Sequence, residues 1–439
     1  MTHGAKAAGD LQGLLALLKS ADLFAWEVRR VRESNDQLYL VFDAVEAIRR
    51  VESETFSVQI YLQVERDGKQ WLGESGWTAN PGDDFAGDLA LARERAILAL
   101  NPVFRLPGPG QQYHPLKLVD LAVKEEPLQV LWRLRHDLNR SVADVDAVQL
   151  AAVELFGIHR QIDFFNHTGL HGSYEQTELQ TEFALLARAG GQEAESLGWR
   201  RGVFYQDLQM GDMVQRYSRY ALENAAAQLP PSGKYAVVFG EEALDTVFNH
   251  LCAQAGGRAV FQGWSRFQVG EPVIHNPRRD LLTLTSDPWL PGGLNSRPFD
   301  AQGLALQPVT FIQDNLFVRP LVDQRYAHYL GLAPTGGLTN LKVAPGRATL
   351  AEMLERGPVL HLLRFSTLEP NPVTGAISGE IRTGYLVDKG RAVPIKGGSV
   401  SGRLDEACRY LTLSRETEQR ETYFGPAGIR LEEMDIAGS

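Results

Sequence analysis

The sequence holds little cysteine, no long apolar run and no excess of basic charge, and each absence excludes a class of protein. Its two cysteines, Cys252 and Cys408, are too few for a disulfide framework and fit a reducing cytoplasm. No stretch approaches the ~18 apolar residues of a membrane-spanning helix. The first residues lack the apolar segment of a signal peptide. We therefore expect a cytoplasmic protein without a membrane partner.

The charge balance argues against nucleic acid as a partner. The chain has 44 Lys and Arg against 54 Asp and Glu, a formal net charge of −10, whereas non-specific nucleic-acid binding needs a basic face. Arg200, Arg201, Arg216 and Arg219 lie close together in the sequence and could form a local basic patch. Arginine stems along a solvated helix face would give the same spacing, so we expect no nucleic-acid site.

Length and composition predict an ordinary globular protein of two domains. A chain of 439 residues with 44% hydrophobic and 22% charged residues exceeds the size at which a single core usually stops growing. The run Leu-Pro-Pro-Ser-Gly at 229–233 breaks both the helical and the strand period. We place the boundary there, which gives an N-terminal domain over 1–230 and a C-terminal domain over 231–439.

Hydrophobic periodicity predicts hairpins and separate helices without a regular strand–helix–strand rhythm. Residues 55–65 alternate apolar and polar side chains, and Asp67-Gly68 suits a tight turn into a returning strand. The pattern favours an α+β fold, with a mixed N-terminal domain and a strand-rich antiparallel C-terminal domain. The expected strands are 55–65, 70–77, 147–156, 161–165, 175–188, 199–205 and 235–239, and the expected helices are 11–18, 88–100, 127–138, 207–228, 241–254, 350–354 and 404–411.

Two loop-like stretches, 286–303 and 323–337, are dense in Gly, Pro and Asp yet carry large apolar residues. Loops of this length inside a compact domain are usually functional or disordered, and the apolar residues argue against disorder. We therefore take these stretches, with the turn at 371–375, as a candidate groove or partner contact. The candidate residues are Arg297, Asp300, Gly303, Thr335, Gly336, Gly337, Asn371, Thr374 and Gly375.

The residues themselves leave structural and functional roles open. Asp300 either caps its own turn, which is common for Asp near Gly, or bonds a peptide backbone or a partner chain. Arg297 either pairs with Asp300 or reaches a substrate carboxylate. The run Thr335-Gly336-Gly337 permits close approach of another chain, but it suits a tight turn equally.

The motifs in the second half resemble a known family. Pro-Phe-Asp-x-x-Gly at 298–303, Ala-x-x-x-Gly-x-x-x-Thr-Gly at 327–336, Asn-Pro-Val-Thr-Gly-Ala-Ile-Ser at 371–378 and the closing run 426–438 are similar to the TldD/TldE proteins. That family is also called PmbA or modulator of DNA gyrase. The resemblance is close from about Tyr235 onward and limited to pattern before it. It implies two domains that build a dimer around a cavity.

The resemblance also implies a test for a metal site. TldD-type chains carry His-Glu-x-x-x-His on a helix after a strand, with two histidine ligands, a glutamate base and a further ligand from a C-terminal cysteine. Such residues bind a metal and activate its water. Aligning Val237–Gly240 with that strand places Asn249 and Gln254 at the ligand positions and His250 at the base position. Amides are poor ligands for such metals, so we predict no metal, no other cofactor and no catalytic residue.

Other chemical motifs give no specific site. The chain contains no His-Glu dipeptide, no Gly-x-Ser-x-Gly elbow and no phosphate-binding P-loop. Cys408 is interpreted as a small buried residue in a helix. Glu241 and Glu242 are expected in the first turn of a helix, where its dipole favours acids without any catalytic role.

Three functional hypotheses follow. The leading one is a metal-free, TldE-like subunit that pairs with a TldD-like metalloprotease, completes its chamber and guides small or unfolded peptides to it. The second is a stand-alone homodimer that binds a peptide or a regulatory partner, in the manner of a gyrase modulator. The third is a metal-independent hydrolase using Asn249, His250 and Asp300, for which no nucleophile and base can be assembled.

Overall fold

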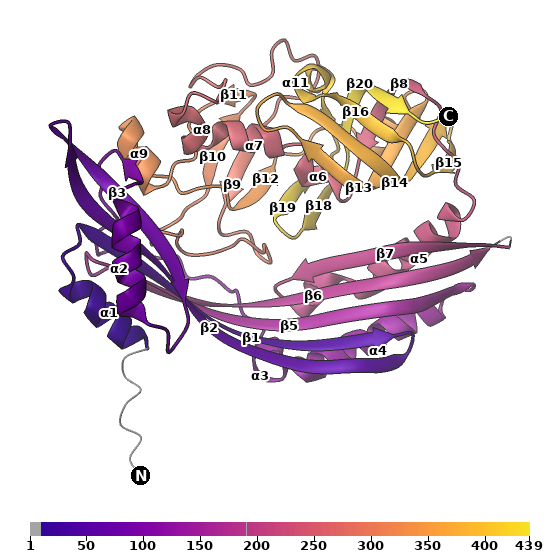
Figure 1. Ribbon diagram of the computed structural model, residues 1–439. Coiled ribbons are helices and arrows are strands. Elements are labelled where there is room, and N and C mark those ends of the chain that lie inside the picture. Colours follow the sequence, from indigo (N-terminus) through magenta and orange to yellow (C-terminus); the bar gives the residue numbers. More distant parts are fainter. Residues whose placement is uncertain (1–9, 190) are drawn as a thin grey trace.

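A long curved sheet organises the N-terminal half of the protein. The computed structural model describes residues 10–189 and 191–439. The sheet is antiparallel, in the order β4-β3-β2-β1-β5-β6-β7, and its long strands curve below the C-terminal half in Figure 1. The strands are β1 (Ala25–Val41), β2 (Ala44–Arg66), β3 (Lys69–Ala79), β4 (Leu100–Asn101), β5 (Val148–Asn166), β6 (His171–Ala189) and β7 (Gln192–Gly202).

The expected hairpin at Asp67-Gly68 is confirmed, with φ of +55° and +69°, but several strand predictions were wrong. The strands expected at 147–156 and 161–165 are one strand, β5, because its pairing with β1 and β6 continues through the intervening residues. The expected strand 199–205 is the end of β7. Strand β1 was not predicted, since its charged centre has no apolar alternation.

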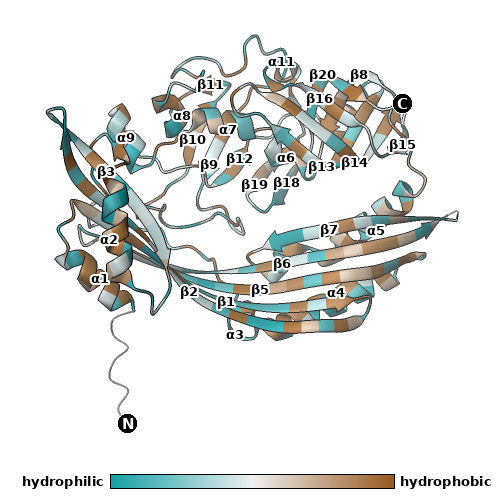
Figure 2. Ribbon diagram, in the orientation of Figure 1, coloured by the Kyte–Doolittle hydropathy of each residue, from teal (hydrophilic) through white to brown (hydrophobic). Residues whose placement is uncertain are grey.

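Helices cover parts of this sheet. The alternation of the strands puts apolar side chains on a covered face, visible as alternating bands in Figure 2. One buried cluster packs α1 and α2 on β1 and β2, and another packs α4 and α5 on β1, β5 and β6. Helix α2 ends at Ala96, earlier than expected, and residues 100 and 101 belong to β4. The helices are α1 (Leu11–Ser20), α2 (Phe85–Ala96), α3 (Leu121–Glu125), α4 (Pro127–Ala143), with the expected proline at its start, and α5 (Met210–Asn224).

The C-terminal half contains two sheets that share one buried core. The first has the order β11-β10-β9-β12-β19-β18. The second runs β13-β8-β20-β16-β14-β15, and β14 also pairs with β13, so five of its strands close on themselves. Most strand pairs of this half are antiparallel, as expected, and the exceptions are the parallel pairs β12–β19 and β13–β8. The strands are β8 (Gly233–Phe239), β9 (Leu284–Asp287), β10 (Val309–Gln313), β11 (Leu316–Phe317), β12 (Asn340–Val343), β13 (Val359–Pro370), β14 (Ala376–Asp388), β15 (Arg391–Ile395), β16 (Ser399–Arg403), β17 (Thr412–Leu413), β18 (Thr417–Arg420), β19 (Tyr423–Pro426) and β20 (Ile429–Ala437).

The single helix expected over 241–254 is broken into two. The chain tightens between them, where the amide of Phe248 donates to the carbonyl of Asp245, and Val247 and Phe248 are both fully buried. The expected helix 404–411 is likewise a short α-helix followed by a 3-10 turn. The helices of this half are α6 (Ala243–Thr246), α7 (Asn249–Ala255), α8 (Gly257–Phe261), α9 (Gln324–Leu330), α10 (Leu350–Glu355), α11 (Leu404–Ala407) and η3 (Cys408–Tyr410).

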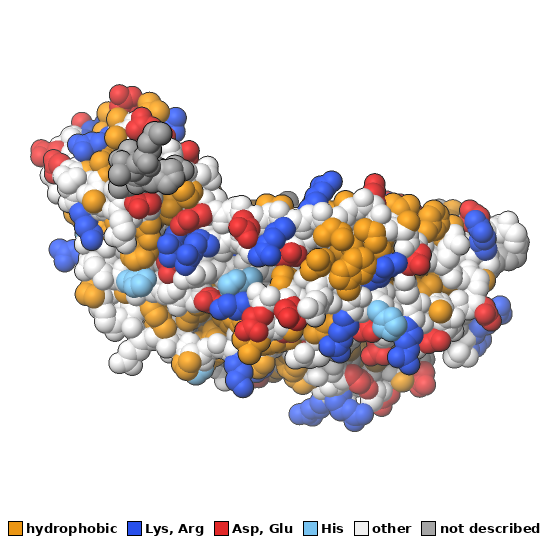
Figure 3. Space-filling model, turned by 90° about the horizontal axis from the view of Figure 1, so that it is seen from below, with side chains coloured by type: hydrophobic (Ala, Val, Ile, Leu, Met, Phe, Trp, Pro, Cys, Tyr) orange, Lys and Arg blue, Asp and Glu red, His pale blue; other side chains and the backbone are white. Residues whose placement is uncertain are grey.

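The helices and strands together confirm the α+β class. The second sheet system begins at β8, close to the boundary placed at 230–231, while the division into two domains stays a prediction. Of the helices in the described residues, none combines the length and apolar character needed to cross a membrane. The face seen from below in Figure 3 carries Lys and Arg interspersed with Asp and Glu rather than a patch of one sign.

Candidate functional site

Helix α7 carries the three positions where the metal motif was expected. The side chain of Asn249 is exposed to solvent, whereas His250 and Gln254 are 3% and 2% exposed. The latter two lie on one face of the helix because residues four apart are neighbours there. Of the two expected ligand positions, Asn249 therefore faces solvent and Gln254 faces the interior.

The amide of Gln254 is occupied by hydrogen bonds to two loops. Its Nε2 donates to the carbonyl of Pro372 at 2.7 Å, and its Oε1 accepts from the amide of Arg266 at 2.8 Å. The side chain therefore fastens α7 to the turn at 371–375 and to the loop after α8. Both ends of the amide serve the backbone, which leaves neither free for another ligand.

The turn at 371–375 lies against the same helix. Asn371 Oδ1 accepts from the amides of Val373 and Thr374, and Gly375 has φ +69°. A Cβ on Gly375 would lie 3.5 Å from the His250 ring. The structure therefore brings Asn371, Thr374 and Gly375 next to α7, although nothing in the sequence between them indicates this contact.

A cavity of about 340 Å³ opens beside this face of α7. It is lined by His250, Gln254 and Cys408, together with apolar residues and the charged residues Arg266, Glu271 and Asp405. Burial lowers the pKa of His250 to about 4 and raises the pKa of the Cys408 thiol to about 12. At neutral pH the cavity therefore presents a neutral imidazole and an un-ionised thiol.

The divalent metal of TldD-type chains does not fit these residues. Metal binding needs converging imidazole, thiolate or carboxylate groups. Here Asn249 faces solvent and the Gln254 amide is bonded to backbone at both ends, so neither of the two expected ligand positions directs a metal-binding group into the site. Over residues 10–189 and 191–439, no three His, Cys, Asp or Glu side chains form a group able to hold a metal.

The loop with Asp300 and Gly303 forms a contact between the two halves of the protein. Asp300 Oδ1 accepts from the amides of Gln302 and Leu304 at 2.8 and 3.0 Å, so this carboxylate caps its own turn. Phe299 packs with Phe164 on the long sheet. Gly303 has φ +80°, and a Cβ there would lie 2.5 Å from the Phe164 ring. Glycine is required because the loop passes this close to the sheet.

The remaining motif residues lie in the C-terminal half. Thr335 exchanges two hydrogen bonds with the backbone of Val322, one through its amide and one through its hydroxyl. Gly336 has φ +75°, and a Cβ there would lie 2.2 Å from Leu306. The carbonyl of Gly337 accepts from Ser286, and the amide of Arg297 donates to the carbonyl of Pro288. A direct role of these residues in a groove or partner contact stays a prediction.

The four arginines noted in the sequence do not form one helix face. Arg200 and Arg201 lie on β7 and reach the C-terminal half, where Arg200 donates to the carbonyl of Gln419 and Arg201 pairs with Glu421 at 3.0 Å. Arg216 on α5 pairs with Glu241 at 3.3 Å, and Arg219 lies over Tyr220. Three of the four therefore join the halves.

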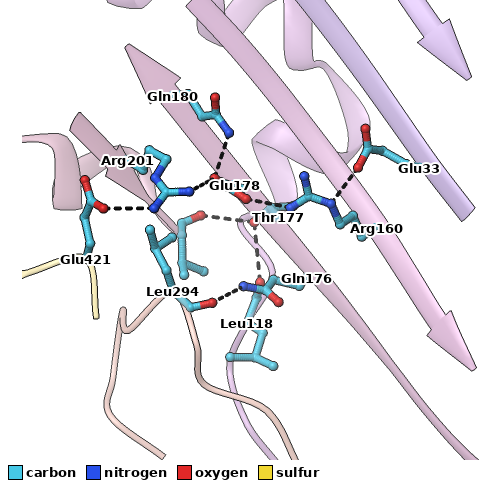
Figure 4. Close-up of polar contacts among 11 residues, drawn as sticks. Glu33, Leu118, Arg160, Gln176, Thr177, Glu178, Gln180, Arg201, Leu294 and Glu421 are labelled. Carbon is cyan, nitrogen blue, oxygen red and sulfur yellow. Dashed lines mark hydrogen bonds and ion pairs between the residues drawn. The ribbon is translucent and has the colours of Figure 1, made fainter. Parts of the chain in front are cut away.

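A row of alternating charges runs across the long sheet to the contact between the N-terminal and C-terminal halves. Arg160 on β5 donates to Glu33 on β1 at 2.6 Å and to Glu178 on β6 at 2.5 Å. Arg201 lies 3.6 Å from Glu178 and pairs with Glu421 beyond the sheet, as Figure 4 shows. Gln176 adds a neutral contact by donating to the carbonyl of Leu294. Polar pairs on one face of the sheet thus hold the C-terminal half in position.

The expectation of a helical first turn was wrong for Glu241, whereas Glu242 lies directly before α6 with helical backbone angles. Glu241 has φ +47°, a left-handed conformation that is rare outside glycine, and is 7% exposed. Its Oε1 accepts from Tyr220 and Arg216 of α5, while Oε2 is buried without a partner. Glu242 accepts from Arg364. Both side chains bond residues of distant elements, and no signal in the sequence indicated these contacts.

The comparisons with known proteins agree with these motifs. Residues 232–438 match the model of the PmbA/TldA metallopeptidase C-terminal domain. The chain is 26% identical over 294 residues to "Metalloprotease PmbA" of Escherichia coli O157:H7 and 22% identical over 293 residues to a "Metalloprotease PmbA homolog" of Buchnera aphidicola. The matched region spans 64% of this chain and 64% of each relative.

Solved structures share the whole fold at low identity. TldE from Thermococcus kodakarensis superposes with a TM-score of 0.79 at 16% identity, covering 97% of this chain and 99% of that one. A putative modulator of a DNA gyrase from Thermotoga maritima gives a TM-score of 0.77 at 18% identity over the same shares. The matched C-terminal domain, the relatives and the common fold lead to one conclusion. The C-terminal part of the chain, residues 232–438, belongs to the TldD/TldE/PmbA family.

Proposed function

We propose that this chain is a non-catalytic subunit of a two-chain metallopeptidase. It pairs with a TldD-like chain that carries the metal, and together they cleave small or unfolded peptides. The observation that carries the proposal is the state of α7, where Asn249 faces solvent and the Gln254 amide is bonded to Pro372 and Arg266. The helix position at which a TldD-like chain would hold its metal here connects two loops instead.

The names of the relatives support the same class. PmbA of Escherichia coli O157:H7 is named a metalloprotease, and one structure with this fold is named TldE. A chain of this family without suitable ligands contributes surface rather than chemistry, because activating a metal-bound water needs both the ion and a nearby base. This chain would shape the chamber and orient the peptide, while the partner's metal performs the cleavage.

The proposal is tested by co-expressing this chain with a TldD-like chain from the same source. We expect the two to co-purify, with about one zinc per TldD-like chain by elemental analysis. Cleavage of an unfolded, fluorescently labelled peptide is expected from the pair and to be abolished by chelator. A glutamate-to-glutamine change in the partner's His-Glu-x-x-x-His motif is the matched control and should abolish cleavage without releasing this chain.

Each alternative gives a different result in the same experiment. Stoichiometric zinc on this chain alone would overturn the proposal. Cleavage by this chain alone that survives chelator would support a metal-independent hydrolase instead. Failure to bind any TldD-like chain, combined with retention of a peptide or a regulatory protein, would support a stand-alone binding protein.

A further inference from the structure

Two polar atoms in the wall of the cavity beside α7 are buried without a hydrogen-bond partner among the described residues. They are Nδ1 of His250, a residue that is 3% exposed, and Oδ1 of Asp405. Both residues line the cavity of about 340 Å³. Buried polar groups are nearly always hydrogen-bonded, so two unpartnered ones in a single cavity indicate a site where a ligand can bond.

The turn at 371–375 brings these two side chains together. The amide of Leu404, at the start of α11, donates to the carbonyl of Gly375 at 2.8 Å, so Asp405 follows directly beside the turn. A Cβ on Gly375 would lie 3.8 Å from Nε2 of His250 and 3.8 Å from Oδ1 of Asp405. The two groups therefore flank the same point, close enough for one small ligand to contact both.

His250 offers the cavity a lone pair and no charge. Burial lowers the pKa of its imidazole to about 4, and a neutral imidazole has one N–H donor and one acceptor nitrogen. The backbone of Val247 lies near the ring, but Nδ1 forms no hydrogen bond of normal geometry with it. The ring can therefore present its acceptor nitrogen to a ligand.

Asp405 offers a carboxylate oxygen. Burial opposes its ionisation, but the hydrogen bond from Arg403 outweighs burial and holds the pKa of this carboxyl below its usual value. Its Oδ2 lies 2.8 Å from Arg403 and 3.7 Å from Arg266, whereas no described residue bonds Oδ1. The ionised carboxylate thus has one oxygen for the two arginines and one for a ligand.

The remaining walls of the cavity suit an apolar group. Leu251, Ile274 and Leu404 are buried and Phe267 is half-buried, while the charged Glu271 of the lining is exposed. A volume of about 340 Å³ falls in the range of small-molecule sites. The cavity therefore fits a ligand with an apolar body and hydrogen-bond donors at one end.

We propose that this cavity binds a primary ammonium group joined to an apolar side chain. The ammonium donates to Oδ1 of Asp405 and to the imidazole of His250, because it carries three donors and no acceptor. A ligand carboxylate in its place would be repelled by the charge of Asp405. The first residue of a peptide and a free apolar amino acid share this chemistry. The peptide source rests on the proposed function, whereas the amino-acid source does not.

Calorimetric titration of the full chain tests the ligand class. The probes are the tripeptide Leu-Ala-Ala, free leucine and the N-acetylated form of each. We expect the tripeptide, leucine or both to bind, and acetylation to weaken binding at least about tenfold, because an amide has no charge and a single donor. Tighter binding of the tripeptide would identify a peptide N-terminus as the ligand, and tighter binding of leucine a free amino acid. Equal binding of the acetylated forms, or no binding of any probe, would overturn the proposal.

Two variants test the contacting residues. Asp405→Asn removes the charge and His250→Phe removes the acceptor nitrogen, so each should weaken binding of the probe roughly tenfold. Asn249→Ala on the exposed face of the same helix is the matched control and should bind as the native chain does. Thermal unfolding shows whether each variant is folded. Unchanged affinity in either variant, or tighter binding by Asp405→Asn, would contradict the proposal. The titration contains no TldD-like chain, so its failure leaves the proposed pairing unaffected, and a failure to pair does not bear on this site.

Discussion

Gln254 occupies one of the two expected ligand positions, but its side chain connects two loops. Its side chain is 2% exposed and bonds the backbone of two loops that are more than a hundred residues apart in sequence. A buried hydrogen bond stabilises modestly, but removing one partner leaves the other group unsatisfied in the interior. The identity of this residue was readable from the sequence, whereas its two partners were not.

A Gln254→Leu substitution should lower the free energy of unfolding by about 2 kcal/mol, because it leaves the Arg266 amide and the Pro372 carbonyl without this partner. Urea denaturation followed by circular dichroism measures the change. Asn249→Ala on the exposed face of the same helix is the control and should stay within about 0.5 kcal/mol. Similar losses for both would show that the Gln254 bonds do not stabilise the helix.

At the scale of elements, charged pairs across strands explain how the polar centre of β1 is accommodated in the sheet. Its centre holds Arg30, Arg32 and Glu33, a pattern that predicts no strand by apolar alternation. In the sheet, Arg30 pairs with Asp163 at 2.7 Å and Glu33 with Arg160. The apolar ends of the strand pack in the two helix-covered clusters, and its charged centre meets opposite charges on β5, which is visible only when the two strands are aligned.

Arg160→Met should destabilise the sheet by roughly 2 kcal/mol, because it leaves Glu178, whose side chain is 9% exposed, without its closest cation. The loss should depend little on salt, since a partly buried pair is weakly screened. Thermal unfolding at low and high ionic strength checks both points. Arg188→Met, in an exposed pair with Glu193, is the control and should change stability little.

At the scale of the whole molecule, two buried carboxyl groups lie where the halves meet. Burial raises the pKa of Glu27 on the long sheet to about 7, with the nearby Asp300 of the C-terminal half adding to the shift. Burial likewise raises the pKa of Asp300 to about 6. In the unfolded chain both groups ionise at their ordinary, lower pKa. The folded protein therefore binds more protons than the unfolded chain between these values.

Stability should consequently fall as the pH rises from about 4.5 to about 7 and then level off, because ionising these groups is costlier in the folded state. Glu27→Gln keeps an acceptor for Tyr61 and should be more stable than the native chain at pH 8, by roughly 1–3 kcal/mol, and equal to it near pH 4. Urea midpoints at several pH values measure this. The exposed Glu65→Gln serves as control and should leave the profile unchanged; an unaltered slope in Glu27→Gln would refute the assignment.

The predictions from sequence succeeded where local pattern alone specifies the structure. The alternation at 55–65, the Asp67-Gly68 turn and the proline at the start of α4 each depend on neighbours within a few residues. The sequence predictions failed where the N-terminal and C-terminal halves meet. Glu241 was expected in a helical turn, yet its left-handed backbone is held by Tyr220 and Arg216 of another element. No local pattern encodes contacts between segments so far apart.

The amino-acid sequence by itself determined the α+β class and the amide side chains at the ligand positions, because composition, short-range period and residue identity require no knowledge of distant contacts. Only the tertiary structure decided that Gln254 would be bonded to two loops, that Arg200 and Arg201 would reach across to the C-terminal half, and that His250 and Asp405 would line one cavity. These outcomes depend on which remote segments meet, and that is settled by the packing of the whole chain.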